Sequence, residues 1–201
     1  TTEIYTLSLH DALPISNQNQ IEVCDNFFQG VDSSNILVRP VSAGTLAVTD
    51  VIVSRNIFED AGLTLGKGFI VIGENAGGAG PPVFRRCVVS GNIGRGFGDS
   101  SGSGVGIGIS GDANPNDGSE IIVSDNILDA RQKDGTQQNS SYGIYVRGDS
   151  RNVTVHDNVV RNTGRSGITL QDVDFVTVHD NVIELAVQYA AAGSPDRKST
   201  R

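Results

Sequence analysis

The amino-acid sequence predicts an all-β solenoid, a fold in which short strands stack in successive coils of one chain. Three observations predict it. A short phrase recurs along the chain, apolar residues alternate within each copy, and the composition combines 25 Gly with neither Met nor Trp. Internal repetition with a period of about 20–50 residues is typical of repeat architectures. β-Branched residues separated by Gly, Asn and Asp favour strands joined by turns.

The repeated phrase predicts one strand in each coil. Its copies are IEVCDNFF, VIVSRNIF, CVVSGNIG, IIVSDNIL, VTVHDNVV and VTVHDNVI, which begin at Ile21, Val51, Cys87, Ile121, Val153 and Val176. In every copy, Val stands three residues before the Asn, and an apolar residue or Cys stands five before it. This period of two predicts a strand with one buried face.

One asparagine occupies the same place in every copy of the phrase. The column consists of Asn26, Asn56, Asn92, Asn126, Asn158 and Asn181. We expect a structural role for it. The residue between two strands of a coil often adopts the left-handed backbone conformation, which Asn tolerates, and stacked amides can hydrogen-bond from coil to coil.

Further strands are predicted between the copies, at residues 36–38, 69–72, 105–109, 143–146 and 167–170. An apolar pair follows each Asn, with Gly94 as the exception. Three short strands per repeat describe a triangular coil. This pattern, with phrases such as SRNVTVHDNVVRNTGRSGITLQD, resembles the right-handed parallel β-helix family, the pectate-lyase-like superfamily, over about residues 17–190. The resemblance implies a right-handed parallel β-helix of about six coils, from a secreted or cell-surface bacterial protein.

The two ends of the chain do not share the repeat. TTEIYTLSLHDALPIS at residues 1–16 and DRKSTR at residues 196–201 resemble conceptual translations of sequencing adapters. We therefore expect three parts: an adapter-derived segment at 1–16, the β-helix at 17–195 and an adapter-derived segment at 196–201. On this interpretation the solenoid is a fragment that lacks both caps.

Charge and hydropathy exclude some partners. The formal net charge is −8, which argues against a nucleic-acid backbone as the main partner. We also expect no membrane span, because no apolar run is long enough to cross a bilayer.

Two sets of reactive residues have alternative interpretations. Cys24 and Cys87 fall in different columns of different coils, too far apart for a disulfide. His156 and His179 share a column, each followed by Asp, and such a cluster could bind a metal or transfer protons. We favour an exposed polar turn and expect no metal site there, because no third convergent ligand is evident.

Enzymes of the resembled family work in a groove along the first strand of each coil. Aligning these strands by their inward residues places Leu37, Val71, Gly108, Tyr145 and Thr169 in one outward column, and Arg39, Gly73, Ser110, Arg147 and Gln171 in the next. The predicted substrate-binding residues are Tyr145, Thr169, Gln171, Arg39 and Asp112. The predicted catalytic residues are Arg147, Asp149 and Asp172, with Arg147 neutralising a sugar carboxylate and an Asp acting as acid, base or Ca²⁺ ligand.

Two functions follow from these residues. The first is binding or processing of a polysaccharide by a lyase, epimerase or hydrolase. The second is a non-enzymatic surface, adhesin or tail-fibre-like module. Its outward stripe Ile52, Val88 and Ile122 is either a trimer contact or ground covered by a long loop, and we favour the loop because the longest insertions flank these coils. Whether the chain is an enzyme stays open, since the Asn-Thr-Asp, Asp-Asp, Gly-His-Gly and Arg-Ile-Lys motifs of polygalacturonases are absent. No cofactor is certain, and Ca²⁺ is the one considered.

Overall fold

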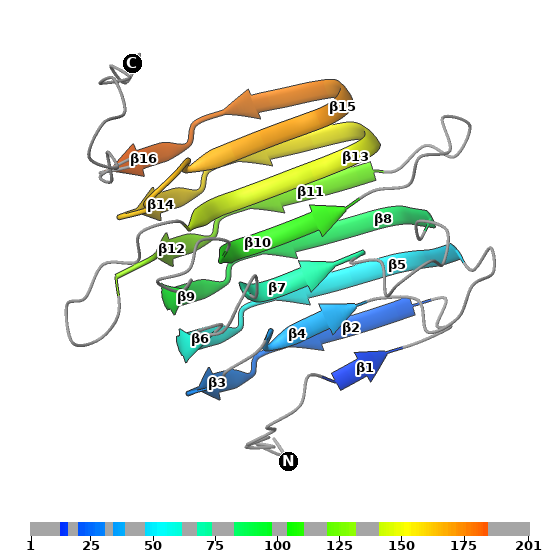
Figure 1. The fold of residues 1–201 in the computed structure, drawn as a ribbon. Coiled ribbons are helices and arrows are strands. Elements are labelled where there is room, and N and C mark those ends of the chain that lie inside the picture. The colour runs from blue at the N-terminus through cyan, green and yellow to red at the C-terminus, as the bar shows by residue number, and fades with distance from the viewer. Residues whose placement is uncertain are drawn as a thin grey trace.

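The computed structural model describes residues 13–15, 20–30, 34–38, 47–61, 68–73, 83–97, 104–110, 120–131 and 141–184. Within these ranges the chain forms strands joined by turns, and no helix is long and apolar enough to cross a membrane. The strands lie side by side like the rungs of a ladder, and the colour runs steadily from one end of the stack to the other (Figure 1).

The strands form three faces of a coiled tube. Face 1 contains β1 (Leu13–Ile15), β4 (Ile36–Val38), β7 (Gly68–Ile72), β10 (Val105–Ser110) and the first parts of β13 (Tyr142–His156) and β15 (Ile168–His179). Face 2 contains β2 (Gln20–Cys24), β5 (Ala47–Ser54), β8 (Val83–Ser90), β11 (Glu120–Ser124) and the second parts of β13 and β15. Face 3 contains β3 (Phe27–Gln29), β6 (Ile57–Ala61), β9 (Ile93–Phe97), β12 (Ile127–Asp129), β14 (Val159–Arg161) and β16 (Val182–Glu184).

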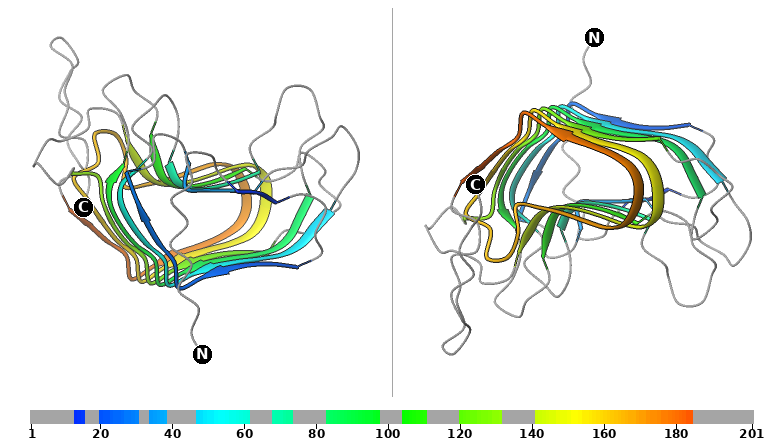
Figure 2. Two further views of the ribbon diagram at one scale, coloured as in Figure 1. Left: turned by 90° about the horizontal axis from the view of Figure 1, so that it is seen from below. Right: turned by 90° about the horizontal axis from the view of Figure 1, so that it is seen from above.

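Every strand pair in these faces is parallel. Faces 1 and 2 belong to one sheet, because β13 and β15 run through both faces, whereas face 3 is a separate six-stranded sheet. Seen along the stack, successive coils superimpose and enclose one interior (Figure 2). The predicted fold class, an all-β parallel solenoid, is confirmed.

β1 belongs to the N-terminal segment that we predicted to be adapter-derived. Leu13 to Ile15 pair with Ile36 to Val38 of β4 in parallel register. An open sheet edge accepts a strand of any origin, so the origin of residues 1–16 stays a prediction. Residues 196–201 lie outside the described ranges.

The interior is filled by the alternating residues of the repeated phrase. Val51, Val53, Cys87 and Val89 are fully buried, and the same two columns continue through Ile121 and its successors in later coils. β-Branched residues pack well on pleated surfaces, and in-register stacking brings identical shapes into contact. The period of two in the sequence is therefore the direct record of this core.

The asparagine column forms a continuous hydrogen-bonded ladder at the corner between faces 2 and 3. The Oδ1 of Asn126 accepts both the backbone N–H and the side-chain Nδ2 of Asn92, at 3.0 and 2.9 Å. The Nδ2 of Asn126 donates to the carbonyl of Val89 and to Oδ1 of Asn158, both at 2.9 Å. The side chain thus supplies partners for polar groups that the corner removes from the sheet.

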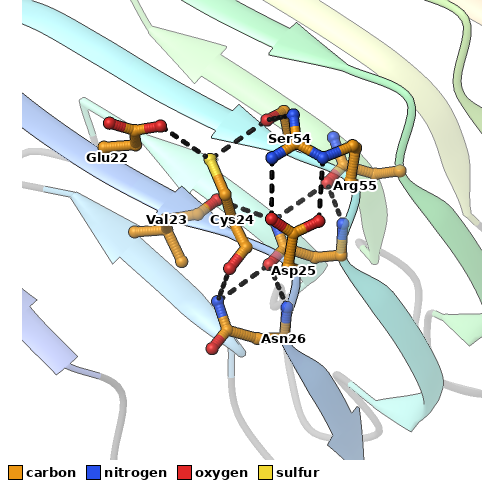
Figure 3. Close-up of polar contacts among 9 residues, drawn as sticks. Glu22, Val23, Cys24, Asp25, Asn26, Ser54 and Arg55 are labelled. Carbon is orange, nitrogen blue, oxygen red and sulfur yellow. Dashed lines mark hydrogen bonds and ion pairs between the residues drawn. The ribbon is translucent and has the colours of Figure 1, made fainter. Parts of the chain in front are cut away.

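The sequence predicts a left-handed backbone conformation for the asparagine of this corner. The structure shows that prediction to be wrong, because the residue before the asparagine adopts this conformation. The positive φ angles belong to Asp25, Arg55, Gly91, Asp125, Asp157 and Asp180. Figure 3 shows the first corner, where Asn26 donates to the carbonyl of Cys24 across Asp25. Because the turn is made one residue earlier, Asn keeps ordinary backbone angles and its amide points into the ladder. Gly, Asp and Asn are the residues that most often adopt the left-handed conformation.

Gly94, the exception in the apolar pair, has a steric cause. A Cβ at Gly94 would lie 2.2 Å from the ring of Phe69, which is fully buried and packs between Phe58 and Phe97. In the next coil the small residue is on face 1 and the large residue is on face 3, because Gly106 faces Leu128. Later coils repeat this exchange with Gly143 facing Val160 and Gly167 facing Ile183.

The stack ends, within the described residues, at β15 and β16. Here the inward column of face 2 is exposed, with Val176 and Val178 at 38% and 48% accessibility, whereas the equivalent Val153 and Val155 of the preceding coil are buried. Burial in this fold therefore comes from the neighbouring coil.

Candidate functional site

The outward columns of face 1 have the register that the sequence predicts. Gly108 pairs with Tyr145, which pairs with Thr169, and Ser110 pairs with Arg147, which pairs with Gln171. Leu37 and Val71 continue the first column toward the N-terminus. Side chains from β10, β13 and β15 therefore meet on one surface.

Two tyrosines and two arginines form the centre of this surface, and we call them the aromatic-arginine cluster: Tyr142, Tyr145, Arg147 and Arg165. The tyrosine rings stack with centroids 5.1 Å apart and planes 21° from parallel. The guanidinium carbon of Arg147 lies 5.5 Å from the Tyr145 centroid, and that of Arg165 lies 5.2 Å from the Tyr142 centroid. Such cation–π contacts hold the arginines against the face while leaving their N–H groups available.

Hydrogen bonds fix both arginines in place. Arg147 donates through Nε to the hydroxyl of Ser110 at 3.0 Å, and Arg165 donates to the phenol oxygen of Tyr142 at 2.8 Å. Arg147 and Arg165 remain exposed. An arginine that is already oriented loses less conformational entropy when it binds an anion.

A polar branch extends the cluster toward the last coil. The hydroxyl of Tyr145 donates to Oε1 of Gln171, whose Nε2 donates to Asp172 at 3.3 Å. Asp172 is exposed and adopts a left-handed conformation with φ of 53°. Of the predicted catalytic residues, Arg147 and Asp172 thus lie on one surface, linked through Tyr145 and Gln171.

Three predicted site residues cannot be placed in this arrangement. Arg39 and Asp112 lie outside the described residues, as does the side chain of Asp149. The backbone of Asp149 belongs to β13, at the point where the register with β15 shifts between Arg147 and Ser150.

Sequence reasoning missed Tyr142 and Arg165. Strict alternation from the inward residues Ile144 and Val146 would turn Tyr142 inward. However, Gly143 also faces the interior, where an added Cβ would meet Val160, so alternation fails at the start of β13. The glycines that precede the inward Ile107 and Ile144, Gly106 and Gly143, could have signalled this irregularity. Arg165 lies in a turn, where no strand pattern fixes its direction.

The histidine pair forms a second polar group, at the end of face 2. The rings of His156 and His179 stack 5.0 Å apart and 5° from parallel, and each Nδ1 is hydrogen-bonded to the following Asp157 or Asp180. This contact pairs each ring with a carboxylate. No group of three or more His, Cys, Asp or Glu side chains within the described ranges could hold a metal ion.

The two cysteines differ in environment. Cys24 is half-buried, with its Sγ 3.0 Å from the hydroxyl of Ser54 (Figure 3). Complete burial raises the pKa of the Cys87 thiol to about 12, which keeps it protonated and unreactive at neutral pH. Beside Cys24, the hydrogen bonds from Arg55 lower the pKa of Asp25.

One comparison with known protein families gives a match over part of the chain. Residues 101–193 match the family described as "Right handed beta helix region". This part of the chain, which includes β10 to β16 and the whole aromatic-arginine cluster, is therefore a right-handed β-helix. The strands of β2 to β9 continue the same register in front of it. No curated protein and no solved structure matches the chain.

Proposed function

We propose that face 1 binds an extended anionic polysaccharide, with the aromatic-arginine cluster as the central contact. The observation that supports this most is the pair of oriented arginines beside two stacked tyrosines. Two guanidinium groups on one face create a local positive potential that opposes the net charge of −8. Guanidinium groups bind carboxylate and sulfate groups through paired hydrogen bonds, and aromatic rings contact the apolar faces of sugars.

The spacing of the coils suits a chain-like ligand. Parallel coils repeat about every 4.8 Å, so polar groups of face 1 recur along the stack at a regular interval. Ser110, Tyr145, Thr169 and Gln171 supply hydroxyl and amide groups around the arginines. Such groups hydrogen-bond sugar hydroxyls. Because polysaccharides of this kind lie outside cells, we also propose a secreted or cell-surface location.

Binding is tested by affinity electrophoresis of the purified chain in gels that contain a polyuronate, a sulfated polysaccharide or a neutral glucan. We expect retardation by at least one anionic polymer, a weaker or absent effect of the neutral glucan, and loss of retardation at high salt. Arg147→Gln should abolish the effect. Arg86→Gln is the matched control, because Arg86 is an exposed arginine on face 2 that pairs with Asp50. Equal retardation by all three polymers, or by wild type and Arg147→Gln, would contradict the proposal.

Processing of the bound polymer is a further step of the same proposal. Lyases and epimerases that act on uronic acids need a cation near the sugar carboxylate and a base near C5, roles that we assign to Arg147 and Asp172. Incubation with polyuronates, followed for unsaturated or epimerised products, tests it. Turnover that Asp172→Asn abolishes without loss of binding supports an enzyme. Binding without turnover supports the non-enzymatic adhesin-like module.

A further inference from the structure

Face 3 carries an exposed apolar column along its whole described length. The first residues of its six strands are in register, and we call them the apolar ridge: Phe27, Ile57, Ile93, Ile127, Val159 and Val182. Phe27, Ile57, Ile93, Ile127 and Val182 are 42–47% exposed. By comparison, the predicted stripe on face 2 has one exposed member, Ile122 at 38%, beside the half-buried Ile52 and Val88. Contiguous exposed apolar surface of this kind marks an interaction site.

A column of polar residues runs parallel to the ridge, two residues further along each strand. This charge ladder consists of Gln29, Glu59, Arg95, Asp129, Arg161 and Glu184. From Glu59 onward the sign of the charge alternates from strand to strand. Alternation matters because it makes the ladder complementary to an inverted copy of itself.

We infer that the apolar ridge is the interface of a two-fold dimer in which a second copy of this chain packs antiparallel on face 3. A two-fold axis along the strand direction inverts the stack but leaves each column opposite itself. The apolar ridge of one copy then packs on the apolar ridge of the other, and the charge ladder faces the other charge ladder. This is an isologous contact, the commonest kind in homodimers.

The charges select one register for this dimer. With the axis between β9 and β12, Glu59 faces Arg161 of the second copy and Arg95 faces its Asp129, and symmetry repeats both pairs. A slip by one strand places Arg95 against Arg161 or against itself, and Glu59 against Glu184 or Asp129. Like charges in direct opposition are unfavourable, so this slip is excluded. A slip by two strands restores complementarity but buries less of the ridge.

The contacts that the charge ladder makes within one chain agree with this arrangement. Within the described residues, the side chain of Arg95 forms no hydrogen bond or ion pair, and Asp129 is held in position by Asn162, whose Nδ2 donates to it at 2.7 Å. Arg161 pairs with Glu184 at 2.8 Å but both side chains are about half exposed. The ridge supplies the apolar area, and the ladder supplies the alignment.

The contact is narrow, so we expect a weak dimer. Two residue columns cover less than the roughly 800 Å² per partner of a standard interface, which suggests a dissociation constant on the order of 10–100 µM. Sedimentation velocity of the full chain over a wide concentration range at low salt should show a monomer–dimer equilibrium. Ile93→Asp should leave only monomer, whereas Ile122→Asp, the matched apolar-to-acid change on face 2, should leave the equilibrium unchanged. Circular dichroism checks that both variants stay folded.

Charge variants test the register. Arg95→Glu should raise the dissociation constant at least tenfold, because it places two Glu–Asp pairs in the interface. Cross-linking tests the direction. In a Cys24→Ser background, a mixture of Ile57→Cys and Val159→Cys chains should be joined by a short bismaleimide, since facing sheets lie about 10 Å apart. Neither variant should cross-link to itself.

Three results would overturn the inference: a monomer at every concentration, a dimer that survives Ile93→Asp, or self-cross-linking of Ile57→Cys as efficient as that of the mixture. The dimer does not depend on polysaccharide binding, because face 3 and face 1 are different surfaces. Failure of one proposal therefore leaves the other intact.

Discussion

The asparagine ladder and the aromatic-arginine cluster differ in burial and in how often they repeat along the stack. The ladder repeats in six copies of the phrase, and Asn56, Asn92, Asn126 and Asn158 are fully buried. The cluster draws on β13 and the turn that follows β14, and its arginines are exposed. Among the described residues of earlier coils, Gly108 and Val71 occupy the place of Tyr145.

The difference shows how a solenoid separates stability from recognition. A residue that repeats in register contacts the equivalent residues of the neighbouring coils, so it contributes to stability in every coil. An exposed residue that breaks the repeat has no such partner and contributes little to the stability of the stack. Exposed departures from the repeat are therefore where binding is expected, and substitutions should separate the two classes cleanly.

The largest expected effect is loss of a central ladder residue. Asn126→Ala would leave the N–H groups of Asn92 and the carbonyl of Val89 without their partners in a buried corner. We expect a loss of about 3–5 kcal/mol in the free energy of unfolding, measured by urea denaturation. Asn181→Ala, at the half-buried end of the ladder, is the control and should cost about 1 kcal/mol. Equal costs at both positions would show that the ladder does not act through burial.

The second effect is steric and arises where the core breaks its own repeat. Gly94→Leu would drive a side chain into the ring of Phe69, and we expect a loss of about 3 kcal/mol. Phe69→Gly should compensate, because the pair then reproduces Gly106 and Leu128 of the next coil. The double variant should be more stable than either single variant in thermal unfolding. A double variant no better than Gly94→Leu would mean that the two positions do not share one space.

Much of the fold could be predicted from the sequence, because a parallel in-register stack turns every spatial neighbour into a sequence repeat. The register of the face 1 columns was predicted correctly by counting from inward residues such as Ile144. Leu37, which was predicted to face outward, is nevertheless buried. The corner was misplaced by one residue, since the sequence shows that Asp125 and Asn126 both suit a turn but not which one has positive φ. Tyr142 was missed because Gly143 interrupts the alternation.

The candidate site was less predictable than the fold for the same reason. Arg147 and Asp172 do lie on one surface, but the contacts that orient Arg147 involve Tyr145 and Ser110 and depend on side-chain direction. The apolar ridge of face 3 repeats as regularly as the core, so pattern alone does not distinguish its outward residues from inward ones. Only the position of the corner decides which of Phe27 and Phe28 is buried.

A smaller effect on stability, with a large effect on binding, is expected at the cluster. Tyr145→Ala removes the ring against which Tyr142 and Arg147 lie, together with the hydrogen bond to Gln171. Polysaccharide affinity should fall at least tenfold, while the free energy of unfolding changes by less than about 1 kcal/mol because the side chain is only half-buried. Thr154→Ala on face 2 is the control for both measurements. A loss of stability equal to that of Asn126→Ala would show instead that Tyr145 stabilises the fold as the asparagine ladder does.

The smallest effect at neutral pH is expected at Cys87, which occupies an inward column that is otherwise Ile or Val. Burial raises its pKa from 9.0 to about 12 in the folded chain. Below pH 9 the thiol is protonated in both states, so its contribution to stability is fully present. As pH rises from 9 toward 12, the unfolded chain loses a proton that the folded chain keeps, and the free energy of unfolding should fall by about 1.4 kcal/mol per pH unit. Cys87→Val should match wild type at pH 7 and lack this part of the alkaline decline. If the free energy of unfolding of Cys87→Val and of wild type fell equally up to pH 11, the raised pKa of Cys87 would be refuted, because other groups alone would then explain the decline.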